Sequence, residues 1–330
     1  MTKKKLLVLR FSALGDVTMI APVLDEFLIQ NPDVEIYVAS RPFMETIFKS
    51  NPKINFIPID LQKDYNGIQG VFKLYRFLKS YNFDYIADLH NVIRTKAITF
   101  LFNVNGKKTA TLFKGRKEKK ALISQSNKQL KQLKLTTERY ADVLRKLGFN
   151  LILSHQFKNS QDKIYKSIGI APFAAFTSKM YPIEKMKIVA KKLAEDGYKI
   201  FLFGGGNKEV EELKTWESLH ENIKSLAGNL KFEEELNTIS KLEVMISMDS
   251  ANMHLASLKG TRCISIWGGT HPYAGFLGYG QSYDDVIQDN TLKIRPTSVF
   301  GKDPKEFEDY DYFKNLDADF VYKEIIKRLQ

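Results

Sequence analysis

The chain has 330 residues, of which 44% are apolar and 27% charged, and its formal net charge is +12. This composition excludes an intrinsically disordered chain, and the length exceeds what one hydrophobic core usually organises, so we expect two globular domains. The apolar stretch at residues 6–9 is broken by Arg10, which argues against a signal-peptide core, and no run approaches the roughly 20 apolar residues of a membrane span.

The first half of the chain alternates strand-like and helix-like patterns. Apolar runs and helical spacing predict strands at 6–11, 34–39, 54–59 and 85–89 and helices at 19–28, 42–49, 71–78 and 138–147. Strands that alternate with helices form βαβ units around a parallel sheet. Residues 158–163 are polar and aperiodic, so we expect a linker there, between one domain at 1–157 and another at 164–330.

The second half repeats the alternation. The pattern predicts strands at 167–171, 199–203, 224–227, 244–247 and 263–267 and helices at 183–195, 208–219, 233–242, 251–258 and 318–329. Residues 289–317 give no assignment. The single cysteine, Cys263, falls in an apolar run and cannot form an intramolecular disulfide, which favours a buried strand position and a reducing compartment.

Basic residues are concentrated in one segment. Residues 107–134 contain ten Lys or Arg side chains and one acid, Glu118, a local balance of +9 that supplies most of the excess charge. Such a segment fits a phosphate-rich partner, namely a nucleic acid, an anionic lipid headgroup or a phosphorylated glycan. The alternative is a solvated, lysine-rich insertion without a partner.

Polar residues gather where strands are expected to end, which is the edge at which open parallel sheets bind ligands. The first such junction runs from Ser12 to Asp16, directly after the opening strand. Its Gly15 permits a tight turn and a close approach to a ligand. Asp16 lies at the start of the next helix and is either an N-cap or a catalytic carboxylate.

Two further junctions lie in the second half of the chain. Lys179 precedes a helix that opens at Pro182, where its charge would add to an anion site made of backbone amides. Gly204 begins a three-glycine loop, which indicates close approach of a ligand to the backbone. Glu209, in the helix after this loop, either accepts ribose hydroxyls or is an ordinary first-turn acid.

The fourth junction joins the strand at 244–247 to the helix at 251–258. Asp249 and Ser250 stand at the helix N-terminus, whose free amides and positive dipole end suit a pyrophosphate. His254 lies one turn further along the same helix face. These residues are equally compatible with a capped helix and a histidine satisfied within the core.

In this order, the junctions resemble the motifs of the lipopolysaccharide heptosyltransferases, glycosyltransferase family nine. The opening Arg10-Phe11-Ser12-Ala13-Leu14-Gly15-Asp16 is similar to the family's R-x-S-A-x-G-D signature. Glu138-Arg139-Tyr140 with Leu147-Gly148 resembles the family's E-R-Y…L-G element, and Lys179 with Tyr181-Pro182 resembles its K-x-W-P element. Asp249-Ser250 with His254 resembles its D-[S/T]-G-x-x-H element, and Gly268-Gly269-Thr270-His271-Pro272 resembles its G-x-T-x-P element. Five motifs in the family's order make the resemblance specific.

This resemblance implies an α/β architecture of two tandem Rossmann-like domains, the glycosyltransferase B fold, with a cleft between them. It implies an enzyme without a cofactor that moves heptose from ADP-heptose to a lipopolysaccharide core acceptor by an inverting, metal-independent displacement. The expected partners are an ADP-activated sugar and an anionic lipid-linked glycan, and no nucleic acid. We expect the chain to be cytoplasmic and peripheral to the inner face of the inner membrane.

The resemblance and the charge pattern together suggest roles for individual residues. Asp16 would be the general base that takes the proton of the acceptor hydroxyl. The N-terminal domain would bind the acceptor through Arg10, Ser12, Gly15, Arg94, Arg116, Lys117 and Lys120. The C-terminal domain would bind the donor and its phosphates through Thr177, Ser178, Lys179, Gly205, Glu209, Asp249, Ser250, Ala251 and His254. The sequence shows no His, Cys and carboxylate cluster at metal-ligand spacing, so we expect no metal site.

The sequence departs from the family pattern at several points. Ala174 and Ala175 stand where hydroxyl residues are common, so Thr177 or Ser178 would have to substitute, Tyr181 replaces a tryptophan and Ala251 a glycine. Two alternatives stay open: a transferase or epimerase that uses another nucleotide sugar, and a non-catalytic nucleotide- or nucleic-acid-binding protein. Residues 107–134 offer only Phe113 as an aromatic side chain, which argues against single-strand binding by stacking.

Overall fold

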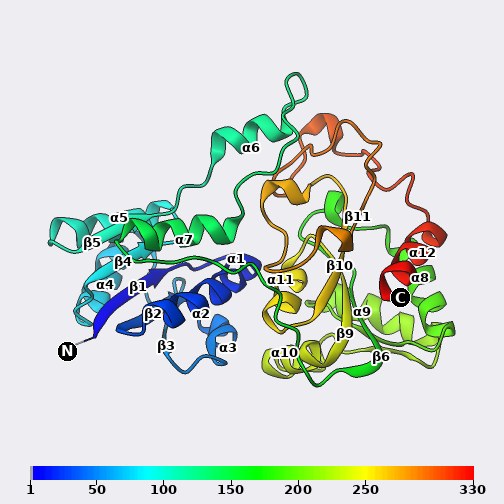
Figure 1. The fold of residues 1–330 in the computed structure, drawn as a ribbon, viewed down its shortest axis with the longest axis horizontal. Helices are drawn as coiled ribbons and strands as arrows, with labels where there is room; N and C mark the ends of the chain where they lie inside the picture. Colours follow the sequence, from blue (N-terminus) through cyan, green and yellow to red (C-terminus); the bar gives the residue numbers. More distant parts are fainter. Residues whose placement is uncertain (1–2) are drawn as a thin grey trace. The chain divides into compact units, whose positions relative to one another are not determined.

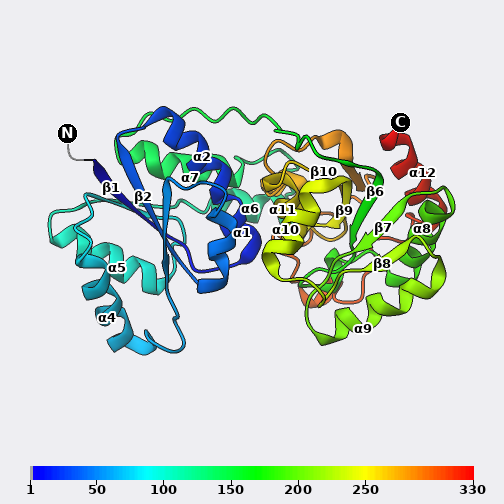
Figure 2. The same ribbon diagram turned by 90° about the horizontal axis from the view of Figure 1, so that it is seen from below.

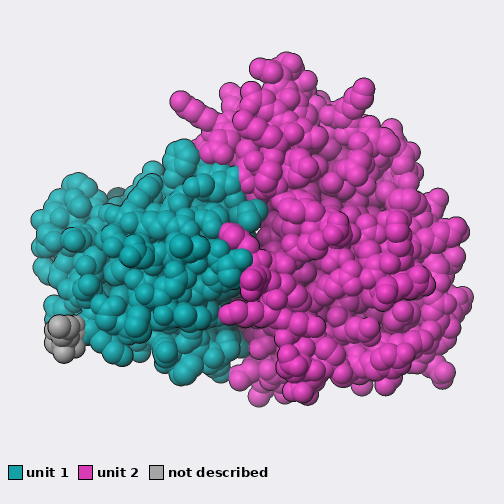
Figure 3. Space-filling view, in the orientation of Figure 1, with its two compact units in different colours: residues 1–115, 134–154 teal, residues 116–133, 155–330 magenta. Residues whose placement is uncertain are grey.

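The computed structural model describes residues 3–330 of the chain, which divides into two compact units. Figure 3 colours the described residues of unit 1, 3–115 and 134–154, in teal and those of unit 2, 116–133 and 155–330, in magenta. The division differs from the expected one in two respects. The last change of unit comes at Ser154 rather than within residues 158–163, and residues 116–133 belong to unit 2.

Unit 1 is built on a five-stranded parallel sheet in the order β3-β2-β1-β4-β5 (Figure 1). Its strands are β1 (Lys4–Leu9), β2 (Val34–Ser40), β3 (Ile54–Pro58), β4 (Tyr85–Asp88) and β5 (Lys108–Thr111). Its helices are α1 (Leu14–Thr18), α2 (Ile20–Gln30), α3 (Glu45–Phe48), α4 (Gly67–Lys79), α5 (Ile93–Val104) and α7 (Thr136–Lys146). The strand order reverses between β1 and β4, so the switch point of this sheet lies at their carboxyl ends.

Helices cover both faces of this sheet, which is why its central strands are nearly continuous apolar runs. α4 and α5 share one face, where Leu74 and Leu78 of α4 and Ile98 and Phe102 of α5 join sheet side chains in one buried cluster. α2 lies on the other face, as right-handed crossovers would place it, and α7 packs against α2, β4 and β5 (Figure 2). The sheet is therefore shielded from solvent except at its edges and strand ends.

Unit 2 contains a six-stranded parallel sheet in the order β11-β10-β9-β6-β7-β8. Its strands are β6 (Ile164–Ala171), β7 (Lys199–Leu202), β8 (Ile223–Ser225), β9 (Leu242–Met248), β10 (Arg262–Trp267) and β11 (Val286–Gln288). Its helices are α6 (Arg116–Ile123), α8 (Ile183–Glu195), α9 (Asn207–Thr215), α10 (Phe232–Lys241), α11 (Ala251–Leu258) and α12 (Ala318–Leu329). The strand order reverses between β6 and β9, which places the switch point of this sheet there.

The main core of unit 2 lies between the sheet and two helices far apart in sequence. Met186 and Leu193 of α8 and Val321 and Ile325 of α12 are buried in one cluster with the sheet. The two helices lie side by side in both views (Figures 1 and 2). The helix that the sequence predicts at residues 318–329 thus buries one face by packing on α8.

The segment 116–133 is fixed to unit 2 by apolar packing. Leu122 of α6 and Leu133 are buried with Ala274 and Val299, and the N–H of Leu133 donates to the carbonyl of Tyr273 at 2.9 Å. Over residues 3–330, every helix falls short of the length and apolar character that a membrane span requires.

Two lysines of the same segment are used in this attachment. The ammonium of Lys119 lies 4.4 Å from the ring centroid of Phe276, a cation–π contact, and the side chain is buried. Lys128 donates to the carbonyls of Ile294 and Pro296. Part of the basic segment therefore serves structure rather than solvent-facing recognition.

Candidate functional site

The first polar cluster lies at the switch point of unit 1, where Leu9 of β1 is paired with Asp88 of β4. α1 begins at Leu14, so Asp16 is its third residue and Ala13 is the N-cap. The Asp16 carboxylate accepts the N–H of Ala13 at 3.5 Å. The interpretation of Asp16 as the N-cap is therefore wrong, because Ala13 occupies that position, although the Asp16 carboxylate lies in the first turn of the helix.

Arg10 holds the Asp16 carboxylate in place. Its guanidinium lies 2.6 Å from Asp16 Oδ2, donates to the carbonyl of Leu89 and stands 5.5 Å from the ring centroid of Tyr140. The Arg10 side chain is 8% exposed, whereas that of Asp16 is 28% exposed. Arg10, expected to contact an acceptor, is thus committed to Asp16 and the protein backbone, and the carboxylate is the solvent-facing member of the pair.

His90, which the sequence reasoning missed, lies beside this pair. Ser12 Oγ and His90 Nε2 are 3.3 Å apart, and the buried carboxylate of Asp88 accepts the backbone N–H of His90 at 3.0 Å. Burial, followed by the positive charges of Arg10 and Lys114, lowers the pKa of His90 to about 4. The imidazole is therefore neutral near pH 7. Its position directly after a predicted strand was the signal that could have identified it.

The remaining predicted acceptor residues are dispersed. Gly15 is the second residue of α1, outside the left-handed backbone region, so a tight turn does not explain it. Arg94, in the first turn of α5, donates to the carbonyl of Tyr65. Arg116, Lys117 and Lys120 are exposed on α6. Because α6 packs with unit 2, the prediction that these three lie on the N-terminal domain is wrong.

The second polar cluster lies at the switch point of unit 2. Lys179, in the loop between β6 and α8, pairs with Asp249 at the end of β9, with 2.9 Å between Nζ and Oδ2. The two side chains are 13% and 7% exposed. Thr270, which follows β10, donates its hydroxyl to the same Asp249 oxygen at 2.8 Å. Asp249 therefore orients Lys179, and Thr270 orients Asp249.

The N-terminus of α11 adjoins this pair. Ser250 is its N-cap with extended backbone, and its hydroxyl pairs with Ser247 Oγ at 3.1 Å instead of capping the helix. The first amides of the helix, beginning at Ala251, consequently receive no side-chain cap from Ser250. His254 is buried within the same helix. A fixed cation beside uncapped helix amides is an arrangement that binds phosphate groups.

Arg295 holds the loops around this cluster in place through hydrogen bonds to their carbonyls. It lies in residues 289–317, which the sequence left unassigned, and it was not predicted as a site residue. Its buried guanidinium donates to the carbonyls of Gly268, Asp289 and Thr270, the last at 2.9 Å. Burial lowers the pKa of Arg295 to about 10. Because Thr270 in turn contacts Asp249, Arg295 fixes the loop that orients the Lys179–Asp249 pair. Nothing in its local sequence marks this role.

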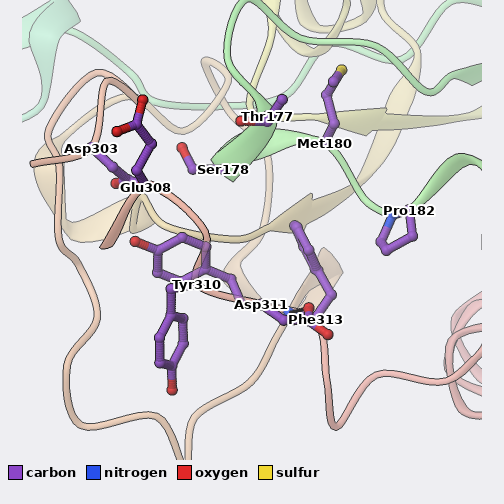
Figure 4. A pocket seen from close by; sticks show the side chains of 10 residues that line it. Thr177, Ser178, Met180, Pro182, Asp303, Glu308, Tyr310, Asp311 and Phe313 are labelled. Atoms are coloured by element: carbon purple, nitrogen blue, oxygen red, sulfur yellow. Dashed lines mark hydrogen bonds between the residues drawn. The ribbon is translucent and has the colours of Figure 1, made fainter. Parts of the chain in front are cut away.

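A pocket of about 180 Å³ is lined in part by residues that precede and follow Lys179 in the sequence (Figure 4). Its lining includes Thr177 and Ser178 together with the carboxylates of Asp303, Glu308 and Asp311. The Ser178 hydroxyl donates to the carbonyl of Gly301 at 2.6 Å, so it does not replace the hydroxyls absent at residues 174 and 175. A pocket with three carboxylates does not favour a diphosphate, which leaves the α11 amides as the better phosphate site.

The three-glycine loop leads into α9. Gly206 is the N-cap of this helix with a φ of +83°, a backbone that glycine adopts readily. Gly205 is exposed, and its N–H donates to Glu209 Oε2 at 2.8 Å. This contact favours the interpretation of Glu209 as a first-turn acid that stabilises the loop. No group of three or more His, Cys, Asp or Glu side chains within residues 3–330 could hold a metal ion.

Comparison with known proteins gives consistent results. Residues 71–293 match the family model glycosyltransferase family 9 (heptosyltransferase). The chain is 26% identical over 335 residues to lipopolysaccharide heptosyltransferase 1 of Campylobacter coli, covering 93% of this chain and 94% of the relative.

Two solved structures share the fold along the whole chain. A glycosyl transferase family 9 protein from Veillonella parvula superposes with a TM-score of 0.73 at 18% identity, covering 100% of this chain and 98% of the other. The E. coli heptosyltransferase WaaC with ADP superposes with a TM-score of 0.70 at 15% identity, covering 99% and 100%. Both support the two-domain α/β architecture of the glycosyltransferase B type expected from the sequence.

Proposed function

Because the chain belongs to glycosyltransferase family 9 (heptosyltransferase), we propose that it transfers heptose from ADP-heptose to a lipopolysaccharide core acceptor. The reaction is an inverting displacement without a metal ion, and the protein works at the cytoplasmic face of the inner membrane on an anionic, lipid-linked glycan. The name of the Campylobacter coli relative supports the acceptor class, and the ADP of the E. coli structure supports the nucleotide. Family membership favours transfer over epimerisation and over a non-catalytic binding protein.

The observation that carries the proposal is the Asp16 carboxylate, held by buried Arg10 yet more exposed than its partner. In the proposed reaction Asp16 accepts the proton of an acceptor hydroxyl, and that oxygen forms a bond to the anomeric carbon of the heptose. The bond from that carbon to the diphosphate oxygen breaks on the opposite face, so the configuration inverts and ADP leaves with the electron pair. A carboxylate is a competent base for this proton transfer.

The departing ADP gains negative charge, which requires stabilisation where the bond breaks. Lys179 supplies a positive charge fixed by Asp249, and the first amides of α11 supply hydrogen-bond donors at the positive end of a helix dipole. Asp249 acts in this scheme by orienting Lys179. Ser250 as N-cap, with Ala251 and His254 in the first half of α11, forms the helix end that faces the diphosphate.

Two measurements test the proposal. Titration calorimetry in the presence of a chelator should show binding of ADP with higher affinity than UDP or GDP. Incubation with ADP-heptose and a heptose-deficient lipopolysaccharide core should add the mass of one heptose, again without divalent cation. A preference for UDP would indicate another nucleotide sugar as donor. Activity lost with chelator and restored by magnesium or manganese would contradict the metal-free displacement.

A further inference from the structure

The outer faces of α4 and α5 carry large apolar side chains into solvent. Ile68 and Phe72 of α4, and Ile93, Phe100 and Val104 of α5, are each more than half exposed. Their spacings of four residues in α4 and of seven and four in α5 place them along one stripe of each helix. Single exposed apolar side chains are common on proteins, but two adjacent stripes form a continuous patch of the kind that marks an interaction surface.

The charged residues of these two helices are all basic. α4 contains Lys73, Arg76 and Lys79, α5 contains Arg94 and Lys96, and neither helix contains Asp or Glu. Arg76 and Lys79 continue the stripe of Ile68 and Phe72, and Lys96 lies on the stripe of Ile93 and Phe100. All of these cations except Arg94 are exposed. The patch therefore combines apolar side chains with positive charge, without a compensating acid on either helix.

The two stripes face the same side of unit 1. The inner faces of α4 and α5 contribute Leu74 and Ile98 to one core cluster against the same face of the sheet. Figures 1 and 2 show the two helices next to each other on that sheet. Their outer stripes consequently form one surface, which we call the α4–α5 face and define by the five apolar residues and four exposed cations named above.

We propose that the α4–α5 face docks on the surface of an anionic lipid bilayer. The apolar side chains enter the boundary between headgroups and acyl chains, and the cations contact lipid phosphates, which is how interfacial helices bind membranes. Charge complementarity selects this occupant over a second copy of the chain, because self-association through this face would oppose like charges. The inference rests on the proposed function for the membrane concerned, since a lipid-linked acceptor lies in such a surface, but its test needs no transfer chemistry.

The test is co-sedimentation of the full chain with vesicles of phosphatidylcholine alone or mixed with phosphatidylglycerol. We expect binding to the anionic vesicles that weakens as salt rises. Phe72→Ser with Phe100→Ser should lower the partition coefficient at least tenfold. Lys73→Gln with Arg76→Gln and Lys79→Gln should lower it roughly fivefold per cation. The matched control is Ile188→Ser with Phe320→Ser, two exposed apolar residues on helices of unit 2, which should bind like the parent protein.

Several outcomes overturn the inference: no binding of the parent protein to anionic vesicles, equal loss in the control, or binding that survives both α4–α5 variants. Loss of vesicle binding in Arg116→Gln with Lys117→Gln and Lys120→Gln, with the α4–α5 variants unaffected, would assign docking to α6 instead. Concentration-dependent dimerisation through Phe72 and Phe100 in the absence of lipid would assign the face to a second copy. Far-UV circular dichroism and urea unfolding confirm that each variant is folded, and a chain that docks as expected but transfers no heptose would contradict the proposed function alone.

Discussion

The carboxylate of Asp16 and the guanidinium of Arg10 form an ion pair with a separation of 2.6 Å, which joins the first turn of α1 to the end of β1. A general base must be held in position and must also be reached by its substrate. Buried Arg10, anchored by the carbonyl of Leu89, provides the first condition, and the greater exposure of Asp16 provides the second. The pair therefore links a structural contact to a catalytic proposal, and the two contributions can be separated by substitution.

Asp16→Asn should reduce turnover on the true acceptor by a factor on the order of 10²–10⁴, because an amide cannot accept the hydroxyl proton. The same substitution should lower the free energy of unfolding by about 1–3 kcal/mol, because Arg10 loses a charged partner while the amide oxygen still accepts a hydrogen bond. Initial rates and urea unfolding measure the two effects, and ADP affinity should not change. Near-normal turnover would overturn the assignment of Asp16 as base.

Lys179→Met should weaken ADP binding tenfold or more, because it removes the fixed cation proposed to face the diphosphate. The matched control is Lys185→Met. Lys185 lies in the first turn of α8, but its ammonium donates to the carbonyls of Phe313 and Leu316, so its loss should affect stability and leave ADP affinity within twofold. Calorimetric titration with ADP measures both. Equal weakening in the two variants would argue against a specific phosphate contact by Lys179.

Thr270→Val should weaken ADP binding several-fold and cost about 1 kcal/mol of stability, because it removes the hydroxyl that orients Asp249 without changing the side-chain volume. Thr297→Val is the control in the neighbouring loop. Its hydroxyl contacts Tyr312 and Asp303, at 2.6 and 2.8 Å, and the carbonyl of Gly269 at 3.3 Å, rather than Asp249. Loss of ADP affinity in Thr297→Val but not in Thr270→Val would contradict the proposed chain from Thr270 through Asp249 to Lys179.

The regular elements were predictable because their periodicity reflects burial. The helices α8, α11 and α12 have the bounds that the sequence predicted, and Cys263 is buried in β10 as expected. α5 and β5 were not assigned, because α5 has apolar side chains on its exposed face as well as on its buried face, which obscures the contrast between the two, and β5 has only four residues. β11 was missed for a related reason, since a three-residue strand is too short for a periodic signal.

The site was partly predictable for a different reason. Asp16, Lys179 and Asp249 each follow a strand, and topology brings strand ends together, so local patterns were sufficient to predict that they lie at the carboxyl ends of the sheets. Arg295 could not be found this way, since it acts through carbonyls of the loops around Gly268 and Asp289 that only the tertiary structure brings to it. The predicted location of α6 in the N-terminal domain was wrong for the same reason, since α6 packs against Val299, which is distant in sequence.

Unit 2 should lose stability as the pH falls from about 6.5 towards 3, in part because of His271. Burial, then the positive charges of Arg295 and Lys128, lowers the pKa of His271 to about 3. Its Nδ1 accepts the N–H of Tyr273 at 3.1 Å, which requires the neutral ring. The unfolded chain binds a proton below about 6.5 while the folded chain does not, so acid favours unfolding across this interval.

His271→Asn tests this origin of acid sensitivity. Asparagine keeps an acceptor for the N–H of Tyr273 but does not titrate, so the decline in the urea midpoint between pH 6.5 and 4 should become shallower. His220→Asn is a matched control, because His220 Nδ1 also accepts a backbone N–H, that of Asn222. An unchanged pH slope in His271→Asn, or an equal change in both variants, would assign the acid sensitivity to other groups.

Within residues 107–134, the exposed cations and the cations that donate to backbone carbonyls should respond differently to neutralisation. Arg116→Gln with Lys117→Gln and Lys120→Gln removes three solvent-facing charges of α6, which the sequence predicts to contact the anionic acceptor. The KM for the acceptor should rise, and added salt should reproduce the effect on the parent protein, because exposed charges are screened over about 8–10 Å at ordinary ionic strength. ADP affinity and the melting temperature should stay close to those of the parent.

Lys128→Gln provides the contrast, because Lys128 donates to the carbonyls of Ile294 and Pro296, on either side of Arg295. Its loss should lower the melting temperature, and since Arg295 fixes the loop that carries Thr270, it should also weaken ADP binding. Steady-state kinetics with varied acceptor, calorimetric titration with ADP and thermal unfolding distinguish the two classes. If the α6 triple variant lost ADP affinity while its acceptor KM stayed constant, the exposed cations would belong to the donor site, and their assignment to the acceptor would be wrong.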